Sequence, residues 1–359
     1  MKTDFQPACL PTLIGSLPVK DHREAHELVM AHTPEIPPWA QLPAFRQEGM
    51  IPQFIPGLPG LKTAGDKQYI DTAGSGFETE LVAFYEAYLA CSEDAAGLDD
   101  SIFALTDRTA AGFSALCKGL AASGTDLSAV KGQVSGPITF ATGVKDQNDQ
   151  AIFYHDQLRD AAVKLLAMKA RWQVRVLSKF NRPVIIFLDE PGLAGFGSSE
   201  FISITREAVN DCLEEVVAAI HAEGGLAGVH VCANTDWSLL LDSALDIINF
   251  DAYAYFDRLI LYADQLKNFV ADGGILAWGI VPTLEAEDIE KESAESLRIK
   301  WEAQLDQVTA LGLSRETVMS RSLITPACGV GSQTRPLALK VLELTRDLSR
   351  LIRRTMGAI

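Results

Sequence analysis

Eight short runs rich in β-branched and other apolar residues alternate along the chain with longer segments of helical spacing. The runs cover residues 11–16, 52–57, 129–135, 183–189, 227–232, 246–251, 274–281 and 319–325. Some of them, such as residues 184–188, are continuously apolar, which is typical of strands covered on both faces. Because strands that alternate with helices form a parallel sheet, and eight such units close on themselves, the pattern predicts an α/β fold, a single (β/α)8 TIM barrel.

The segments between the runs carry apolar residues three and four positions apart. One predicted helix lies within residues 198–225, where serines precede the apolar run and two glycines end it, and another covers residues 333–354. Residues 34–75 are rich in Pro and Gly, so we expect them to elaborate the N-terminal part of the barrel with a long loop. No linker divides the sequence, and we expect residues 1–359 to form one domain.

Acidic residues outnumber basic residues, which limits the partners of the chain. With 31 Lys and Arg against 47 Asp and Glu, the formal net charge is −16. This charge disfavours nucleic acids and anionic membranes, which are polyanions. The sequence has neither a signal-peptide pattern nor a run of about 18 apolar residues. We therefore expect a cytoplasmic protein whose partner is a small molecule or another protein.

Six cysteines in a chain of 359 residues are too sparse for a disulfide framework, and we expect all six to be reduced thiols. Cys91, Cys117 and Cys212 lie in helical segments and Cys9 in an irregular lead-in, where cysteine acts as a small apolar residue. The other two, at positions 232 and 328, follow predicted strands instead.

His230, Cys232 and Cys328 are the candidate metal ligands. The first two are two residues apart, so on a strand they point to the same face. An isolated H-x-C pair arises by chance more often than it marks a metal site, but this pair closes one predicted strand and Cys328 follows another. Zinc takes nitrogen and thiolate ligands, and three protein ligands leave one position for a substrate.

Acidic residues follow two more of the predicted strands. Asp189 and Glu190 either cap the next helix or act at the barrel mouth, and Asp251 is either a hydrogen-bonded structural acid or a metal ligand. Trp237 and Trp278 belong to the core or line the pocket near the strand ends. The other histidines, at positions 22, 26, 32, 155 and 221, are taken as surface or packing residues.

Five short motifs follow one another at successive strand ends, over nearly the whole chain. They are residues 13–18 (LIGSLP), 135–137 (SGP), 189–191 (DEP), 230–232 (HVC) and 325–329 (TPACG). Together they resemble the catalytic half of cobalamin-independent methionine synthase, in the superfamily that also holds uroporphyrinogen decarboxylase and the methylcobamide:thiol methyltransferases. The decarboxylase branch is a poorer match, because its Arg-rich segment is not reproduced.

The resemblance implies roles for individual residues. His230, Cys232 and Cys328 would hold one zinc ion per chain, and Ser16 and Asp189 would hold the amino-acid part of homocysteine, with Glu190 beside them. Asp189 and Glu190 are the candidate catalytic residues, and a pterin donor would need an acid such as Glu190 to protonate its leaving nitrogen. Two features differ from the family. Asp251 stands where the family has a glutamate zinc ligand, and the sequence has no counterpart of the family's additional folate-binding barrel.

The resulting hypothesis is a zinc-dependent thiol S-methyltransferase that converts homocysteine to methionine. The methyl donor is left open between methylcobalamin or another methylcorrinoid, delivered by a corrinoid or accessory protein, and methyltetrahydrofolate. Three alternatives also stay open: a methyltransferase acting on coenzyme M or another small thiol, a non-catalytic barrel that binds zinc or a corrinoid, and a metal-free barrel enzyme.

Overall fold

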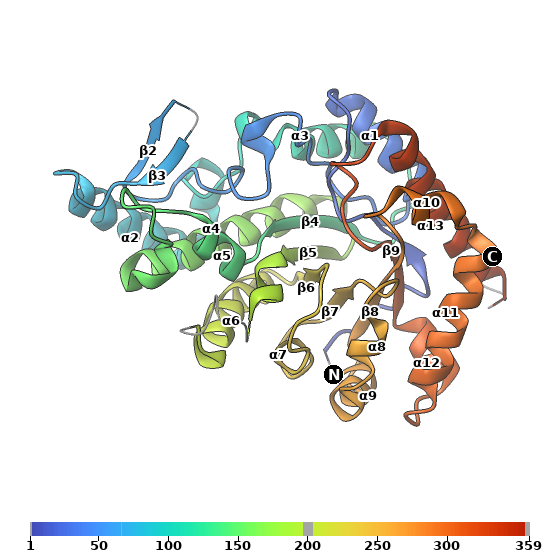
Figure 1. Ribbon diagram of the computed structural model, residues 1–359. Coiled ribbons are helices and arrows are strands. Elements are labelled where there is room, and N and C mark those ends of the chain that lie inside the picture. The colour runs from blue at the N-terminus through green and yellow to red at the C-terminus, as the bar shows by residue number, and fades with distance from the viewer. Residues whose placement is uncertain (1, 66, 197–203, 356–359) are drawn as a thin grey trace.

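A curled parallel sheet forms the centre of the protein, with helices packed around its outer face (Figure 1). The computed structural model describes residues 2–65, 67–196 and 204–355. In spatial order, the strands of the sheet in these residues are β1 (Leu10–Pro11), β9 (Ser322–Pro326), β8 (Ile275–Val281), β7 (Ile247–Phe250), β6 (Leu226–Val231), β5 (Val184–Asp189) and β4 (Val130–Ser135). The α/β class with a parallel sheet is thus confirmed.

Not all of the eight predicted strands are present in the described residues. Six of them correspond to β4–β9, and the first is reduced to the two residues of β1. The run at residues 52–57 was wrongly predicted as a strand, because it folds into successive turns. Its two prolines have no N–H to donate to a strand ladder, and its apolar residues Phe54 and Ile55 are buried in the core without forming a strand.

Residues 35–41 lie between the two edge strands of the sheet, where the expected barrel would need another strand. They reach both sides through isolated bridges, Pro38 with Lys131 of β4 and Gln41 with Ser16 beyond β1. Consecutive prolines in this segment lack N–H donors, so a regular ladder cannot form. The described residues therefore give a seven-stranded curled sheet whose gap is spanned by an irregular segment, in place of the expected barrel of eight regular strands.

The helices follow the strands in the alternating order that the sequence predicts. The α-helices are α1 (His22–His32), α2 (Phe77–Glu93), α3 (Asp107–Ala122), α4 (Pro137–Gly143), α5 (Asp156–Leu177), α6 (Arg206–Ala222), α7 (Ser238–Leu241), α8 (Phe256–Leu259), α9 (Ala263–Ala271), α10 (Ala286–Lys291), α11 (Ala294–Thr309), α12 (Arg315–Ser320) and α13 (Arg335–Thr355). Short 3-10 helices are η1 (Arg46–Glu48), η2 (Ala95–Asp100), η3 (Ile152–Tyr154), η4 (Ser178–Phe180) and η5 (Pro191–Gly195). Helix α13 confirms the prediction at 333–354.

Helix α6 corresponds to the prediction at 198–225 but begins later in the chain. Thr205 caps it, because the Thr205 hydroxyl accepts a hydrogen bond from the backbone N–H of Ala208. Residues 198–203 of the predicted segment lie outside the described residues. None of the helices in the described ranges is both long and apolar enough to cross a membrane.

The Pro- and Gly-rich residues 34–75 contain the irregular segment 35–41, η1 and a second, small sheet. In that sheet β2 (Leu61–Ala64) and β3 (Lys67–Ile70) pair antiparallel, and Figure 1 places them beside α2, away from the large sheet. The organisation of the chain as one domain stays a prediction.

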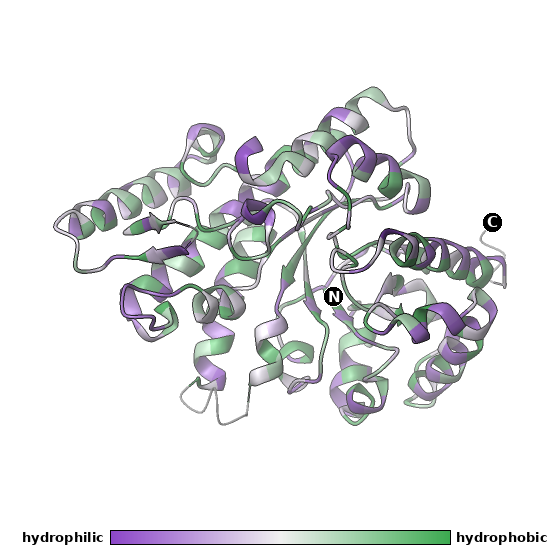
Figure 2. Ribbon diagram, turned by 45° about the horizontal axis from the view of Figure 1, so that its top comes forward, coloured by the Kyte–Doolittle hydropathy of each residue, from purple (hydrophilic) through white to green (hydrophobic). Residues whose placement is uncertain are grey.

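Apolar side chains fill both sides of the curled sheet. Inside the curl, a small cluster brings together residues from distant strands: Leu10, Ile36, Ala129, Ile185, Phe187, Ile247, Ile275, Ala277 and Leu323. A much larger cluster fills the space between the sheet and the helices. Figure 2 shows the consequence, because the helices carry alternating hydrophilic and hydrophobic stripes while the strands are largely hydrophobic.

Gly112 of α3 allows this helix to approach the irregular segment 35–41 closely. A Cβ atom at position 112 would overlap the backbone carbonyl oxygen of Ala40. We expect Gly112→Ala to lower the free energy of unfolding by about 2 kcal/mol or more, measured by urea denaturation, because a backbone atom cannot move aside easily. Gly124→Ala is the control, since a Cβ there meets no atom within 4 Å. Equal stability of the two variants would contradict the packing described here.

Candidate metal centre

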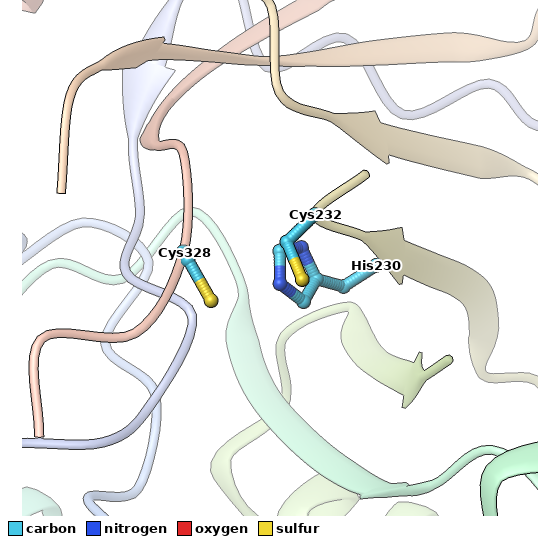
Figure 3. A group of neighbouring side chains, drawn as sticks. All are labelled: His230, Cys232 and Cys328. Carbon is cyan, nitrogen blue, oxygen red and sulfur yellow. The ribbon is translucent and has the colours of Figure 1, made fainter. Parts of the chain in front are cut away.

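His230, Cys232 and Cys328 converge at the carboxyl ends of the strands (Figure 3). His230 belongs to β6 and Cys232 follows that strand, whereas Cys328 follows β9, which is separated from β6 by β7 and β8. Their potential ligand atoms all lie within 4.8 Å of one another. Among the described residues they are the group of histidines, cysteines and acids close enough to share one ion. All six cysteines are free thiols, as expected.

Asn249 of β7 fixes the orientation of the His230 ring. The Asn249 side-chain nitrogen donates hydrogen bonds to the carbonyl oxygen of Ala277 and to the hydroxyl of Thr325, both at 2.8 Å. A carbonyl oxygen can only accept, so the Asn249 oxygen must face His230, where it accepts a hydrogen bond from Nδ1–H. The other ring nitrogen, Nε2, therefore keeps its lone pair for a ligand.

The Nε2 atom of His230 is buried and has no hydrogen-bond partner among the residues that the structure describes. A buried polar atom without a partner is costly unless a ligand satisfies it. With two cysteine sulfurs beside it, this nitrogen completes a donor set of one nitrogen and two sulfurs. The three residues form a possible metal site that is compatible with zinc.

The pKa values of the two cysteine thiols shift in opposite directions. A hydrogen bond from Cys328 and the neighbouring His230 lower the pKa of the Cys232 thiol. The same hydrogen bond, together with burial, raises the pKa of Cys328. One thiolate is thus preformed, which favours binding of a cation at this position because metal ligands must be deprotonated.

A cavity of about 250 Å³ opens beside the three side chains. Ser16, Glu48 and Asp189 also line it. The hydroxyl of Ser16 accepts a hydrogen bond from the backbone N–H of Gly331 at 3.2 Å, so the loop after β9 holds this side chain in place. The structure therefore brings both predicted substrate-binding residues, Ser16 and Asp189, to the same cavity as the predicted metal ligands.

Asp189, the last residue of β5, lines the cavity and has one side-chain oxygen without a hydrogen-bond partner among the described residues. Its side chain is buried, and its Oδ1 atom has no hydrogen-bond partner in the described part of the chain. Burial raises the pKa of Asp189 to about 6, although the charges of His230 and Lys131 act in the opposite direction. A cationic group of a ligand beside this carboxylate would favour its ionised form.

Glu190 points away from the cavity, into the N-terminus of α4. Its carboxylate oxygens accept hydrogen bonds from the backbone N–H groups of Ile138 (2.8 Å) and Thr139 (2.9 Å), and from the Thr139 hydroxyl (2.7 Å). Burial raises the pKa of Glu190 to about 7, and these hydrogen bonds oppose the shift. Gly136 is required here, because a Cβ atom would overlap the Glu190 side chain. These hydrogen bonds are those of an acid that caps a helix. Glu190 is not among the residues that line the cavity, so its predicted catalytic role stays a prediction.

Asp251, which follows β7, is not a member of the close group of ligand atoms. Its Oδ1 atom accepts a hydrogen bond from the backbone N–H of Ala254 at 2.8 Å. Burial raises the pKa of Asp251 to about 6. One oxygen therefore stabilises the turn after β7, and direct ligation of a metal by Asp251 stays a prediction.

Sequence reasoning missed Asn249, Lys131 and Glu48. The first two carried a signal, because each is a polar residue inside a strand that is otherwise apolar or buried. Glu48 lies in the polar stretch 46–49 and gave none. It is buried and pairs with Nε2 of His22 at 2.7 Å. His22 was expected to be a surface or packing residue.

The two tryptophans near the strand ends belong to the core. Trp237 and Trp278 are fully buried and do not line the cavity.

Comparisons with known proteins give only distant likenesses. No protein-family profile and no curated sequence matches the chain. One similar solved structure is a provisionally assigned vitamin-B12-independent methionine synthase from Listeria monocytogenes, with 13% identity, a TM-score of 0.41 and coverage of 62% of this chain and 64% of that one. The chain therefore spans less than two thirds of the Listeria protein.

Carbohydrate-active enzymes give likenesses of the same order. A pneumococcal exo-β-D-N-acetylglucosaminidase module has 9% identity and a TM-score of 0.44, and the alignment covers 96% of this chain and 85% of the module. An endoglucanase from Ruminococcus champanellensis has 13% identity and a TM-score of 0.28, with coverage of 63% and 84%. Function has to be argued from the site.

Asn249 can be tested as the residue that orients His230. We expect Asn249→Ala to weaken zinc binding about 10- to 100-fold, because the imidazole loses the acceptor for Nδ1–H. Competition with a chromophoric chelator measures the affinity. Asn249→Asp is the matched variant, since a carboxylate still accepts that hydrogen bond, and we expect its zinc affinity to stay closer to that of the wild type. Equal losses in both variants would show that the acceptor is not what matters.

Proposed function

We propose that this protein is a zinc-dependent methyltransferase that transfers a methyl group to the sulfur of homocysteine. The observation that supports this proposal best is the convergence of His230, Cys232 and Cys328 on a cavity that is also lined by Asp189, a buried acid with one unpartnered oxygen among the described residues. A soft cation would satisfy the histidine nitrogen and the two cysteine sulfurs. A small ligand with a cationic group would satisfy the Asp189 carboxylate.

The three side chains fit zinc by the chemistry of their donor atoms. His230 offers the buried Nε2 lone pair, and the cysteines offer two sulfurs, one of them readily ionised. Zinc bound there would hold the acceptor's sulfur as a thiolate, the form that is nucleophilic at neutral pH. The protein residues themselves bind and orient the acceptor and keep water away from its sulfur.

The charges around the cavity favour an acceptor with an ammonium group. The described residues that line it include the acids Asp189 and Glu48 and no Lys or Arg. In this proposal Asp189 pairs with the ammonium of homocysteine, and the Ser16 hydroxyl contacts the amino-acid end. An acceptor with an anionic tail, such as coenzyme M, would meet the Asp189 carboxylate, and no Lys or Arg is among the described lining residues to pair with that tail. The charge pattern therefore favours homocysteine over that alternative.

The methyl donor that we propose is a methylcorrinoid presented at the mouth of the cavity. A volume of about 250 Å³ suits a small amino acid, and it lies below the roughly 300–1,000 Å³ of pockets that enclose larger ligands. A pterin donor would also need a proton on its leaving nitrogen, and Glu190, the acid expected for that task, is bound to α4. A corrinoid protein docking at the mouth is the partner that this arrangement suits.

The transfer needs no further reactant. The sulfur of homocysteine forms the new bond to the methyl carbon, and the bond from that carbon to the donor breaks, so that the corrinoid leaves with the electron pair. The thiol proton passes to solvent when the acceptor binds. The residues of the chain hold the acceptor in line with the donor and form no covalent intermediate.

A matrix of thiols and donors tests the proposal. We expect zinc-loaded protein to methylate homocysteine with free methylcobalamin, and to do so poorly with methyltetrahydrofolate. Asp189→Asn should raise KM for homocysteine about tenfold or more, because the ammonium loses its charged partner. Coenzyme M serves as the internal control, because it has no ammonium group, so its turnover should not fall in this variant. Absence of turnover with both donors would contradict the proposal.

A further inference from the structure

Gln41 is the last residue of the irregular segment 35–41, and it lines the cavity. Its backbone N–H donates a hydrogen bond to the carbonyl oxygen of Gly15, and its carbonyl oxygen accepts one from the N–H of Leu17, both at 3.0 Å. These two bonds hold Gln41 alongside Ser16. The residue is buried, and a buried side-chain amide needs partners for both its nitrogen and its oxygen.

Two amide side chains in series fix the direction in which the Gln41 amide faces. The side-chain nitrogen of Gln53 donates a hydrogen bond to the backbone carbonyl oxygen of Thr109 in α3, and a carbonyl oxygen can only accept. The side-chain oxygen of Gln53 therefore faces Gln41, whose Nε2 atom donates to it at 2.8 Å. This order sets the other end of the Gln41 amide, the Oε1 atom, as a hydrogen-bond acceptor.

The Oε1 atom of Gln41 lies close to Gly15, between two residues that line the cavity, Ile14 and Ser16. A Cβ atom at Gly15 would come within 3.1 Å of this oxygen. In the described part of the chain, no residue donates a hydrogen bond to it. The Gln41 oxygen is therefore an oriented acceptor without a protein partner, at the wall of the cavity.

We infer that Gln41 determines specificity for the methyl acceptor: its Oε1 atom accepts a hydrogen bond from the ammonium group of that ligand, as a second partner in addition to Asp189. An ammonium group has three N–H donors, so one carboxylate oxygen does not satisfy it alone. A fixed neutral acceptor adds direction to the charge that Asp189 supplies. The inference rests on the proposed function, because it assumes an acceptor that carries an ammonium group.

The other polar side chains of the cavity wall agree with an amino-acid ligand. The Ser16 hydroxyl already accepts a hydrogen bond from the backbone, so its own proton is left for an acceptor such as a carboxylate. Glu48 is already paired with Nε2 of His22. One hydroxyl donor and the two acceptors Gln41 and Asp189 thus match the carboxylate and the ammonium group of an α-amino acid.

Calorimetric binding of two thiols to zinc-loaded protein tests the inference. Homocysteine and its deamino analogue 4-mercaptobutanoate share the thiol and the carboxylate, so the ratio of their dissociation constants isolates the ammonium group. Gln41→Met removes the amide at similar volume. We expect it to weaken homocysteine binding about tenfold and to change 4-mercaptobutanoate binding by less than about twofold, with zinc content unchanged.

Two variants separate contact with the ligand from a structural role. Gln41→Glu keeps an acceptor oxygen, but its carboxylate cannot donate to Gln53, and we expect its affinity ratio to stay within about threefold of the wild-type ratio. Gln173→Met is the structural control. Gln173 is buried, accepts a hydrogen bond from Nε1 of Trp39 and donates one to the carbonyl of Gln133, so it holds the same segment without lining the cavity. We expect it to lower stability and leave the ratio unchanged.

Gln53→Met tests the orientation while Gln41 itself stays intact. Without the oxygen of Gln53 to face, the Gln41 amide can turn, and we expect the preference for homocysteine to fall about threefold. Gln53 does not line the cavity, so this variant removes no contact of its own with the ligand.

An unchanged affinity ratio in Gln41→Met and Gln53→Met would overturn the inference. So would an equal fall of the ratio in Gln173→Met, because Gln41 would then act only by holding the segment. Failure of the wild type to bind homocysteine would refute the proposed function and the inference together, whereas homocysteine binding that ignores Gln41 would refute the inference alone.

Discussion

The curl of the parallel sheet is the constraint on which the candidate site depends. It brings the end of β6, with His230 and Cys232, within reach of the segment after β9, with Cys328, although β7 and β8 lie between these strands. Residues 35–41 hold the remaining gap by isolated bridges, and the same segment supplies Gln41 to the cavity wall. A small apolar cluster packs residues of distant strands against one another.

Two adjacent acids have different surroundings because of their positions. Glu190 is satisfied by the backbone and hydroxyl donors of α4, whereas Asp189, one residue earlier, lines the cavity and keeps one oxygen without a partner among the described residues. Successive side chains at a strand end point in opposite directions, so only one of the pair can face the cavity. The motif that contains both residues therefore joins α4 to the sheet and at the same time places one carboxylate at the wall of the cavity.

The sequence was informative where periodicity and strand order decide the outcome. Runs rich in apolar residues located β4–β9, and the spacing of His230 and Cys232 predicted that both face the same side at the end of β6. Residues 52–57 form turns because their prolines cannot donate to a strand ladder. A pattern of apolar residues alone does not reveal this effect. The role of Asn249 in orienting His230 also escaped prediction, because it arises from contacts between neighbouring strands.

Metal analysis of the purified protein tests the central claim most directly, namely that His230, Cys232 and Cys328 hold a zinc ion. The account predicts one zinc ion per chain in the wild type and in Cys117→Ser, which changes a cysteine of α3 outside the group. It predicts loss of that zinc in Cys328→Ser, because a hydroxyl is a poor replacement for a thiolate ligand. Undiminished metal in Cys328→Ser, or a wild-type protein that takes up no zinc, would contradict it.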